Sequence, residues 1–200
     1  MQYSSTGKIF EEILKYLNMI AKDSPLNGMS MGDVARVAIR ELPVLQMIDL
    51  RVAPGSASFI VIGEALGIDI PVQPGQSSTS KNKISTLCLA PDWWLIVGTQ
   101  EVEQKLAQLL DNYHFSVVDV SGQRTTIELE GPNVGEVLAH LWEQDLREKT
   151  FPVGSVSQGL MAKAPVIVWH IAAFRYRVLA RSSFALHLWK ALVDAAEEWV

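Results

Sequence analysis

The pattern of apolar and polar residues over 117–153 predicts a strand, a sharp corner and a helix. After a polar turn at 121–124, side chains alternate in character over 125–130, which predicts a β-strand. Gly131-Pro132 ends this strand, because proline has no amide hydrogen for a sheet and presets the first turn of a helix. Apolar residues then recur at helical spacing, namely Val134, Val137, Leu138, Leu141 and Trp142. A return through Phe151-Pro152 completes one strand–helix unit.

The segment before residue 84 shows the same kinds of signal. Apolar residues spaced mostly by two over 34–52 predict strands, and Pro43 within them indicates an edge position or a bulge. The run 57–66 predicts a helix, with Gly67 placed to cap its end. The stretch 71–83, rich in Pro, Gly and Ser, is typical of an exposed loop.

A strand pair and a second helix follow. Residues 84–89 and 93–97 predict two strands joined by a turn at 90–92. Gly98-Thr99 opens a helix that ends at Leu109 or Leu110, with Thr99 as its N-cap.

The order of elements repeats along the chain. The strand ending near Pro54, with its helix, corresponds to the strand ending near Pro132, and the strand pair 87–98 corresponds to 166–180. The offset of roughly 80 residues indicates an internal duplication. We therefore predict an α+β fold of two β-α-β-β-α halves with mainly antiparallel sheets. These halves, about 31–115 and 116–200, form a single domain over 31–200.

Residues 1–30 are predicted to form an amphipathic helix and a linker. The apolar positions of this helix are Ile9, Phe10, Ile13, Leu14, Leu17 and Ile20. A lone helix of this length needs a surface to lie on. That surface is either its own domain or another chain.

Composition narrows the classes of partner. The 200 residues are 48% hydrophobic and 20% charged, as in an ordinary globular protein, and the net charge is −5. The absence of a Lys/Arg cluster argues against a nucleic acid partner. The one cysteine, Cys88, excludes a disulfide within the chain and favours an intracellular setting. No apolar stretch approaches the ~20 residues that cross a bilayer, so we expect a cytoplasmic protein with no membrane partner.

The sequence indicates no local chemical site. The histidines are dispersed without metal-ligand spacing, at His114, His140, His170 and His187. His140 lies beside two glutamates on a predicted helix, and Asp119 and Ser121 share one face of a predicted strand without a histidine to complete a triad. There is no GxGxxG or Walker loop. We predict no catalytic, cofactor-binding or metal-binding residue in this chain.

Five residues are candidates for a partner interface. Trp93 and Trp94 alternate across a strand, so one of them faces outward or into a second layer, although either is also a core candidate. Arg175 and Arg177 share one face of the strand 174–179, which predicts either a solvated face or, together with Arg181, contact with carboxylates of another subunit.

An ordered series of short motifs resembles one known family. The series comprises Ile39-Arg40-Glu41-Leu42-Pro43, Ile48-Asp49-Leu50-Arg51, Leu89-Ala90-Pro91-Asp92-Trp93-Trp94-Leu95, Asp119-Val120-Ser121, Leu129-Glu130-Gly131-Pro132, Phe151-Pro152-Val153-Gly154, Met161-Ala162-Lys163-Ala164, Arg181-Ser182-Ser183-Phe184 and Leu188-Trp189. It resembles the gamma subunit of heterotetrameric sarcosine oxidase over about 34–200. That family is related to the folate-binding fold of the glycine-cleavage T-protein, an aminomethyltransferase.

The resemblance implies a non-catalytic subunit that supports assembly with alpha, beta and delta subunits. In such complexes the beta subunit carries the flavins FAD and FMN, the alpha subunit carries NAD and the tetrahydrofolate site, and the delta subunit carries zinc. The complex converts sarcosine to glycine, hydrogen peroxide and a one-carbon unit, released as formaldehyde or passed to tetrahydrofolate.

The chain departs from the family pattern at two places, and these departures leave open which related enzyme complex it serves. The helix over 9–20 is longer than a typical gamma N-terminus, and Gly122 stands where the pattern has histidine. The second departure leaves open a related N-methylamino acid dehydrogenase. The sequence is also compatible with a stand-alone folate-dependent aminomethyltransferase, with Asp119 as its first candidate acid, and with a homo-oligomeric structural protein. The context of Cys88 disfavours the folate-repair relatives, which carry a Lys-Gly-Cys-Tyr motif.

Overall fold

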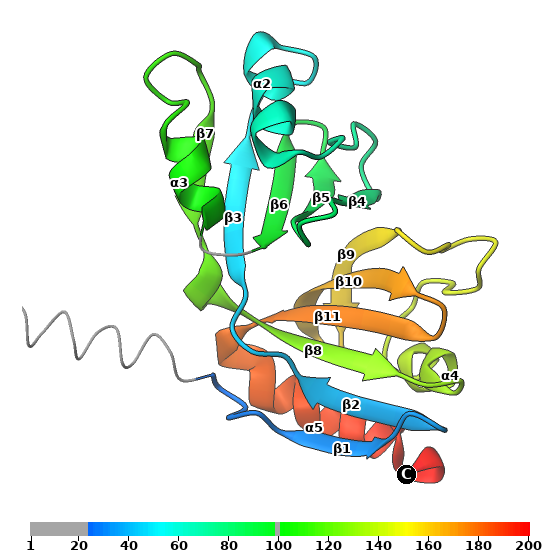
Figure 1. Cartoon of the computed structure of the whole chain (residues 1–200). Coiled ribbons are helices and arrows are strands. Elements are labelled where there is room, and N and C mark those ends of the chain that lie inside the picture. The colour runs from blue at the N-terminus through cyan, green and yellow to red at the C-terminus, as the bar shows by residue number, and fades with distance from the viewer. Residues whose placement is uncertain (1–23, 99–100) are drawn as a thin grey trace, which may run out of the picture.

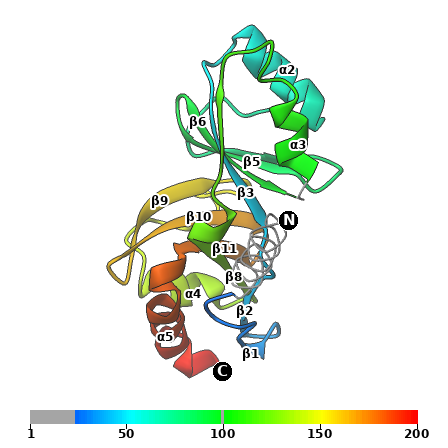
Figure 2. The same ribbon diagram turned by 90° about the vertical axis from the view of Figure 1, so that its left-hand side faces the viewer.

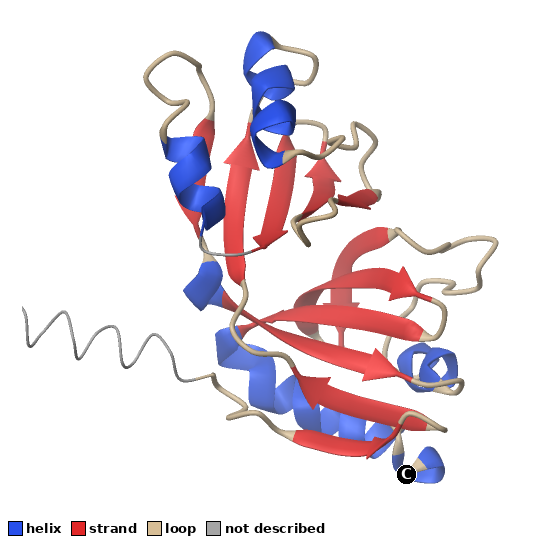
Figure 3. Cartoon of the chain, in the orientation of Figure 1, coloured by secondary structure: helices blue, strands red, loops and turns tan. Residues whose placement is uncertain are grey.

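The computed structural model describes residues 24–98 and 101–200, and these form two antiparallel sheets with helices packed on them (Figures 1 and 3). In chain order the strands are β1 (Ser30–Asp33), β2 (Val37–Glu41), β3 (Gln46–Arg51), β4 (Ser77–Thr79), β5 (Ser85–Ala90), β6 (Trp93–Gly98), β7 (Ser116–Asp119), β8 (Arg124–Glu130), β9 (Val156–Met161), β10 (Ala164–Ala172) and β11 (Arg175–Arg181). The helices are α2 (Ala57–Leu66), α3 (Glu101–Ala107), α4 (Val134–Ala139) and α5 (Ala185–Ala195), with short 3-10 turns at Ser121–Gln123, Ser182–Phe184 and Glu197–Trp199. The predicted α+β class is confirmed.

The two sheets repeat one strand order. The five-stranded sheet runs β4-β5-β6-β3-β7, and the six-stranded sheet runs β9-β10-β11-β8-β2-β1. Along the chain, β3-α2-β4-β5-β6-α3 therefore corresponds to β8-α4-β9-β10-β11-α5. The predicted unit lacked one strand in each half. The first of these, β4, is three residues long and lies in a segment whose composition is typical of a loop.

Each half contributes strands to the sheet of the other half: β1 and β2 join the sheet of the second half, and β7 joins the sheet of the first half. β2 precedes β3 in the chain but pairs with β8, whereas β7 precedes β8 but pairs with β3. The chain thus crosses between the sheets twice, and Figure 1 shows both crossings side by side. A hydrogen bond of 2.8 Å from Val120 N to Met47 O joins the crossing between β7 and β8 to the start of β3. Pro43 lies in the crossing from β2 to β3, so the predicted edge position or bulge was wrong.

A second contact between the sheets forms at their far edges. Ser77 N donates to Gly154 O and Val156 N donates to Gly75 O, both at 2.8 Å. These bonds flank an antiparallel bridge between Gln76 and Ser155. The two segments occupy equivalent places in the repeat, at the starts of β4 and β9 respectively, so the contact lies close to the pseudo-two-fold axis that relates the halves.

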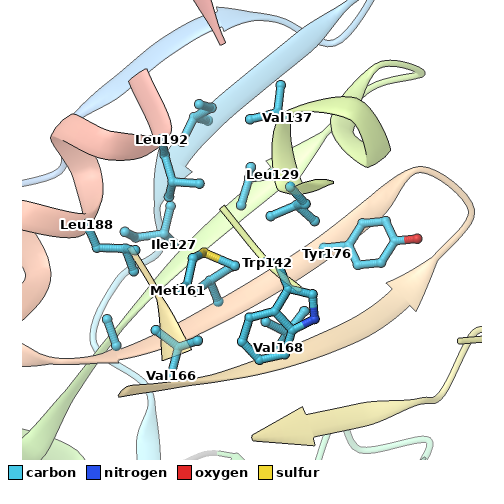
Figure 4. Packing of buried hydrophobic residues seen from close by; sticks show 14 of the residues in the cluster. Ile127, Leu129, Val137, Trp142, Met161, Val166, Val168, Tyr176, Leu188 and Leu192 are labelled. Atoms are coloured by element: carbon cyan, nitrogen blue, oxygen red, sulfur yellow. The ribbon is translucent and has the colours of Figure 1, made fainter. Parts of the chain in front are cut away.

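Three apolar clusters produce four layers. Helices α4 and α5 pack on the outer face of the six-stranded sheet, where Ile127, Leu129, Val168 and Leu188 meet (Figure 4). Helices α2 and α3 pack on the outer face of the other sheet through Ile62, Val102 and Leu106. Figure 2 shows these two helix pairs at opposite ends of the molecule. The third cluster contains strand residues of both sheets, among them Met47, Leu95, Ile167, Trp169 and Leu179. The inner faces of the sheets therefore face each other.

Several local predictions are confirmed. Helix α2 ends at Leu66, and Gly67 adopts the left-handed conformation (φ 62°) and bonds back to Gly63 and Glu64 carbonyls. The Gly131-Pro132 corner also forms. Gly131 has φ 135°, and a Cβ there would lie 2.3 Å from Arg36 O, so only glycine fits.

Two predicted features fall outside the described residues. The N-terminal helix over 9–20 is one, and the N-cap at Thr99 is the other. Helix α3 itself begins at Glu101 and ends at Ala107, with turns continuing to Asn112.

Candidate interface sites

Arg175 and Arg177 lie on one face of β11, as predicted, and this is the inner face of the six-stranded sheet. They stand opposite Glu130 and Glu128 of β8 in the strand register. Arg177 Nε donates to Glu128 Oε2 at 2.9 Å, and Arg175 Nη2 donates to Glu130 Oε1. From β2, Arg40 Nη2 lies 2.5 Å from Glu128 and 3.1 Å from Glu130. We call these five residues the inner-face ladder.

Glu128 is the most buried charge of the ladder. Only 3% of its side chain is exposed, compared with 44% for Arg40 and 26% for Arg177. Burial alone raises the pKa of this carboxyl, but the hydrogen bonds and charges of Arg40 and Arg177 outweigh it, so the pKa lies below its usual value. Glu128 is therefore a carboxylate at neutral pH.

The ion pairs of the ladder affect the predicted contact of Arg175 and Arg177 with carboxylates of another subunit. Arg175 and Arg177 have carboxylate partners within the chain, and the Arg177 guanidinium also lies 5.3 Å from the centre of the Trp169 ring. A carboxylate of another subunit would therefore compete with Glu128 and Glu130. Contact of these two arginines with a partner stays a prediction.

The two neighbouring tryptophans have different environments. Trp94 is fully buried, packs on Phe59 with ring centres 5.3 Å apart, and donates its indole N–H to Pro71 O at 2.7 Å. The core position considered for Trp94 is confirmed. Trp93 is half-buried on the inner face, where the third cluster begins. Of the pair, Trp93 alone offers surface to a partner.

Polar contacts surround Trp93. Its indole Nε1 donates to Asp49 Oδ1 at 3.0 Å, and the Arg51 guanidinium lies 4.5 Å from its ring centre. Arg51 in turn bonds to Asp92 Oδ1 at 3.2 Å. We call Asp49, Arg51, Asp92 and Trp93 the Trp93 cluster. Cation–π contacts of this kind hold an aromatic ring in one orientation.

The ladder and the Trp93 cluster occupy equivalent positions of the two halves. In the register of β3 and β6, Arg51 stands opposite Trp93, as Glu130 stands opposite Arg175 in β8 and β11. Both pairs lie at the end of the strand that leads to the first helix of the unit, so the duplicated fold presents a polar pair at each side of the inter-sheet core.

Arg181, the fifth candidate, is exposed at the other end of β11. Its register partner is Arg124 of β8. Arg124 is half-buried, and its role was not recognised in the sequence because an arginine at the start of a strand resembles an ordinary solvated residue.

Among the other residues considered for chemistry, Ser121 and Asp119 contact each other. His140 is exposed, with Nδ1 2.9 Å from Glu136 O. Ser121 Oγ donates to Asp119 Oδ1 at 2.5 Å and accepts from Met47 N at 2.9 Å, so it fastens the crossing between β7 and β8 to the start of β3. Ser121 lies in a 3-10 turn, as the predicted polar turn at 121–124 implies, so it does not share a strand face with Asp119. Cys88 is fully buried, and burial raises the pKa of its thiol.

The sequence did not single out His170 either. It is buried in β10, its ring stacks on Tyr176 with centres 4.2 Å apart, and its Nδ1 lies 2.8 Å from Phe151 O. No hydrogen-bond partner is found for its Nε2 among the described residues. Only the strand register, which places Tyr176 opposite His170, reveals this stack.

Neither a metal cluster nor a membrane-spanning helix is found in the described part of the chain. Over 24–98 and 101–200, no three His, Cys, Asp or Glu residues gather as a metal site would require. None of the helices in those ranges has the length and apolar character needed to cross a membrane.

Comparison with known proteins identifies relatives over most of the chain. A model of the "Sarcosine oxidase, gamma subunit family" matches residues 52–198. The sarcosine oxidase subunit gamma of Corynebacterium sp. (strain P-1) is 30% identical over 175 residues, which cover 86% of each chain. The subunit of the same name from an Arthrobacter species is 29% identical over the same shares.

Solved structures agree with this family. A chain of the heterotetrameric sarcosine oxidase from Corynebacterium sp. U-96, solved with pyrrole 2-carboxylate, matches with a TM-score of 0.81 and 26% identity, over 88% of this chain and 95% of that chain. Aminomethyltransferase T of the glycine cleavage system from Bartonella henselae matches with a TM-score of 0.58 and 13% identity, over 90% of this chain and 56% of that one. The second likeness shows a shared fold alone and confirms the predicted one.

Proposed function

The chain belongs to the sarcosine oxidase, gamma subunit family, and we propose that it acts by assembly, as a non-catalytic subunit beside alpha, beta and delta subunits. The observation that carries this proposal is the full-length likeness to a chain of a heterotetrameric sarcosine oxidase, with a TM-score of 0.81 over 95% of that chain. A shared fold alone would leave the function open. Here 30% identity over 86% of both chains accompanies it.

The complex oxidises sarcosine to glycine and hydrogen peroxide and releases the N-methyl carbon as a one-carbon unit. Its FAD, FMN, NAD, tetrahydrofolate and zinc belong to the other subunits, and the complex works in the cytoplasm. No reaction step is assigned to a residue of this chain. Its contribution is a rigid four-layer body with polar clusters at its surface.

The geometry of the clusters supports a role in binding other subunits. The half-buried Trp93 ring is held by Asp49 and Arg51, so little side-chain entropy is lost when a partner covers it. The exposed Arg181 lies on the same inner side, at the crossing between the sheets. Fixed aromatic and arginine side chains are the usual anchors of protein interfaces.

Co-expression tests this proposal. The chain is produced with a tag together with the alpha, beta and delta subunits of its host, and the purified material is assayed by size exclusion, flavin absorbance and peroxide release from sarcosine. We expect one yellow complex that contains all four chains and oxidises sarcosine. The His140→Ala variant serves as a control, because this exposed side chain has no proposed role, and its complex should turn over within about twofold of the parent.

Two results would overturn the proposal. One is a colourless chain that elutes alone in the presence of the other three subunits. The other is a complex of the three remaining subunits that assembles and oxidises sarcosine at the full rate when this chain is omitted.

A further inference from the structure

One rung of the β8–β11 pairing brings two like charges together. The register places Arg175 opposite Glu130, Arg177 opposite Glu128 and Leu179 opposite Thr126, whereas Arg181 stands opposite Arg124. Opposite charges in facing positions stabilise a sheet, and like charges in facing positions destabilise it. The same two strands therefore contain two matched rungs and one repulsive rung.

The arginines of the repulsive rung have no anionic partner in the described part of the chain. Every arginine of the inner-face ladder forms an ion pair, but over residues 24–98 and 101–200 no ion pair or hydrogen bond is made by the guanidinium of Arg124 or of Arg181. Burial lowers the pKa of Arg124, the charge of Arg181 lowers it further, and Asp49 only partly opposes both effects. A guanidinium has five hydrogen-bond donors and remains charged, so both of these groups can bind an anionic acceptor from outside the described part of the chain.

A small groove adjoins this rung. It has a volume of about 200 Å³ and is lined by Arg124, Ser121, Ser182, Ser24, Pro43 and Val44, among others. Val44 is 52% exposed, so the groove has an apolar rim beside its hydroxyl groups and its cation. Pockets for drug-sized ligands usually measure about 300–1,000 Å³. This groove suits a single side chain better than a cofactor.

We propose that an acidic side chain of a partner subunit enters this groove at Arg124, which lines it, and also binds Arg181, which stands opposite Arg124 in the strand register. The inference rests on the proposed function, because it needs an assembly with other subunits. A carboxylate has two oxygens that guanidinium groups bind in fork geometry, and binding it relieves the repulsion between the two arginines. The rim residues Pro43 and Val44 pack beside the stem of the entering side chain.

The Trp93 cluster and the rung share the charge of one carboxylate, Asp49. Asp49 accepts the indole hydrogen bond of Trp93 and is close enough to Arg124 to raise the pKa of that guanidinium. In the proposed interface, Trp93 supplies apolar contact area and the rung of Arg124 and Arg181 supplies charge. Such a combination of anchor and charge pair gives an interface both affinity and register.

The test measures binding of the full-length chain to a purified complex of the alpha, beta and delta subunits. The variants are Arg124→Gln and Arg181→Glu, and the control is Arg36→Glu, an equally drastic change at an exposed turn between β1 and β2. We expect the dissociation constant to rise at least about tenfold for each of the two variants and less than about twofold for the control. The affinity of the parent chain should also fall with added salt more steeply than that of Arg181→Glu.

The stability of the isolated chains separates docking from a structural role. Because the rung is repulsive, Arg124→Gln and Arg181→Glu should leave the Tm unchanged or raise it. A lower Tm for Arg181→Glu, matched by a lower Tm for the double change Glu11→Gln and Glu12→Gln, would show that the N-terminal segment fills the groove, and would overturn the proposal. Binding of both variants within about twofold of the parent would also overturn it. If the parent chain itself fails to bind, the proposed function fails and not this inference alone.

Discussion

Replacing Glu128 by glutamine tests whether the inner-face ladder stabilises the fold. Three hydrogen bonds from Arg40 and Arg177 end on this carboxylate. Hydrogen bonds to charged groups contribute about 1.5–3 kcal/mol, and breaking a fully buried ion pair costs about 3–5 kcal/mol. Arg40 and Arg177 are 44% and 26% exposed, so water recovers part of the loss. We expect Glu128→Gln to lower the free energy of unfolding by about 2 kcal/mol.

The assay is urea unfolding of the purified full-length chain, followed by tryptophan fluorescence. Glu130→Gln is the matched control, because Glu130 joins the same ladder but is 23% exposed and should cost less than about 1 kcal/mol. A Glu128→Gln variant as stable as Glu130→Gln would refute the reasoning, since it would mean that burial does not set the strength of these pairs.

The same variant predicts a pH dependence. The pKa of Glu128 is lower in the folded chain than the ordinary value of about 4.3. Its contribution is therefore complete above that value and is lost as the pH falls through the folded pKa. The stability difference between parent and Glu128→Gln should be constant from about pH 6 to 8 and should narrow below about pH 4. A constant difference down to about pH 3 would contradict the ionised state of Glu128.

Three further predictions concern packing. Trp94→Ala should destabilise the chain by about 3–5 kcal/mol because its buried ring leaves a cavity, whereas Trp93→Ala should cost about 1–2 kcal/mol, both measured by urea unfolding. Gly159→Ala places a methyl group 2.7 Å from the Trp142 ring and should cost about 1–3 kcal/mol in thermal unfolding. Its control, Gly122→Ala, meets nothing within 4 Å and should leave the Tm nearly unchanged. Cys88 should react with a thiol reagent at about pH 8 only after urea is added, and rapid reaction of the folded chain would show that the thiol is not buried.

The fold was predictable where local signals coincide with tertiary structure. Helix α2 with its Gly67 cap, the Gly131-Pro132 corner and the strands of the repeat follow from periodicity and turn chemistry within a few residues. Strand β4 was not predictable in this way, because three residues in a loop-like segment become a strand only by pairing with β5. Pro43 was misread because periodicity cannot tell one long strand from two strands in different sheets.

The candidate sites show the same limit. The sequence identified Arg175 and Arg177 as one face of a strand, but Arg40 meets Glu128 across a separation of 88 residues, which no local pattern reports. Likewise, the sequence identified Arg181 as an interface candidate but not Arg124. Only the strand register shows that the two arginines stand opposite each other. Charges on strands acquire a role from their cross-strand neighbours.

The duplication explains why the polar residues gather in these places. The inner-face positions that form the third cluster are apolar, and the strand ends beyond it carry polar residues. The two halves share this geometry, so Arg51 with Trp93 and Glu130 with Arg175 occupy equivalent rungs. Within the second half, the rungs of β8 and β11 differ in their charges: Glu130 and Arg175 form an ion pair, whereas Arg124 and Arg181, at the crossing of the chain, are both positive. A chain that acts by assembly needs surface groups that a partner subunit can pair. The two arginines of the repulsive rung, beside the crossing, fit that requirement.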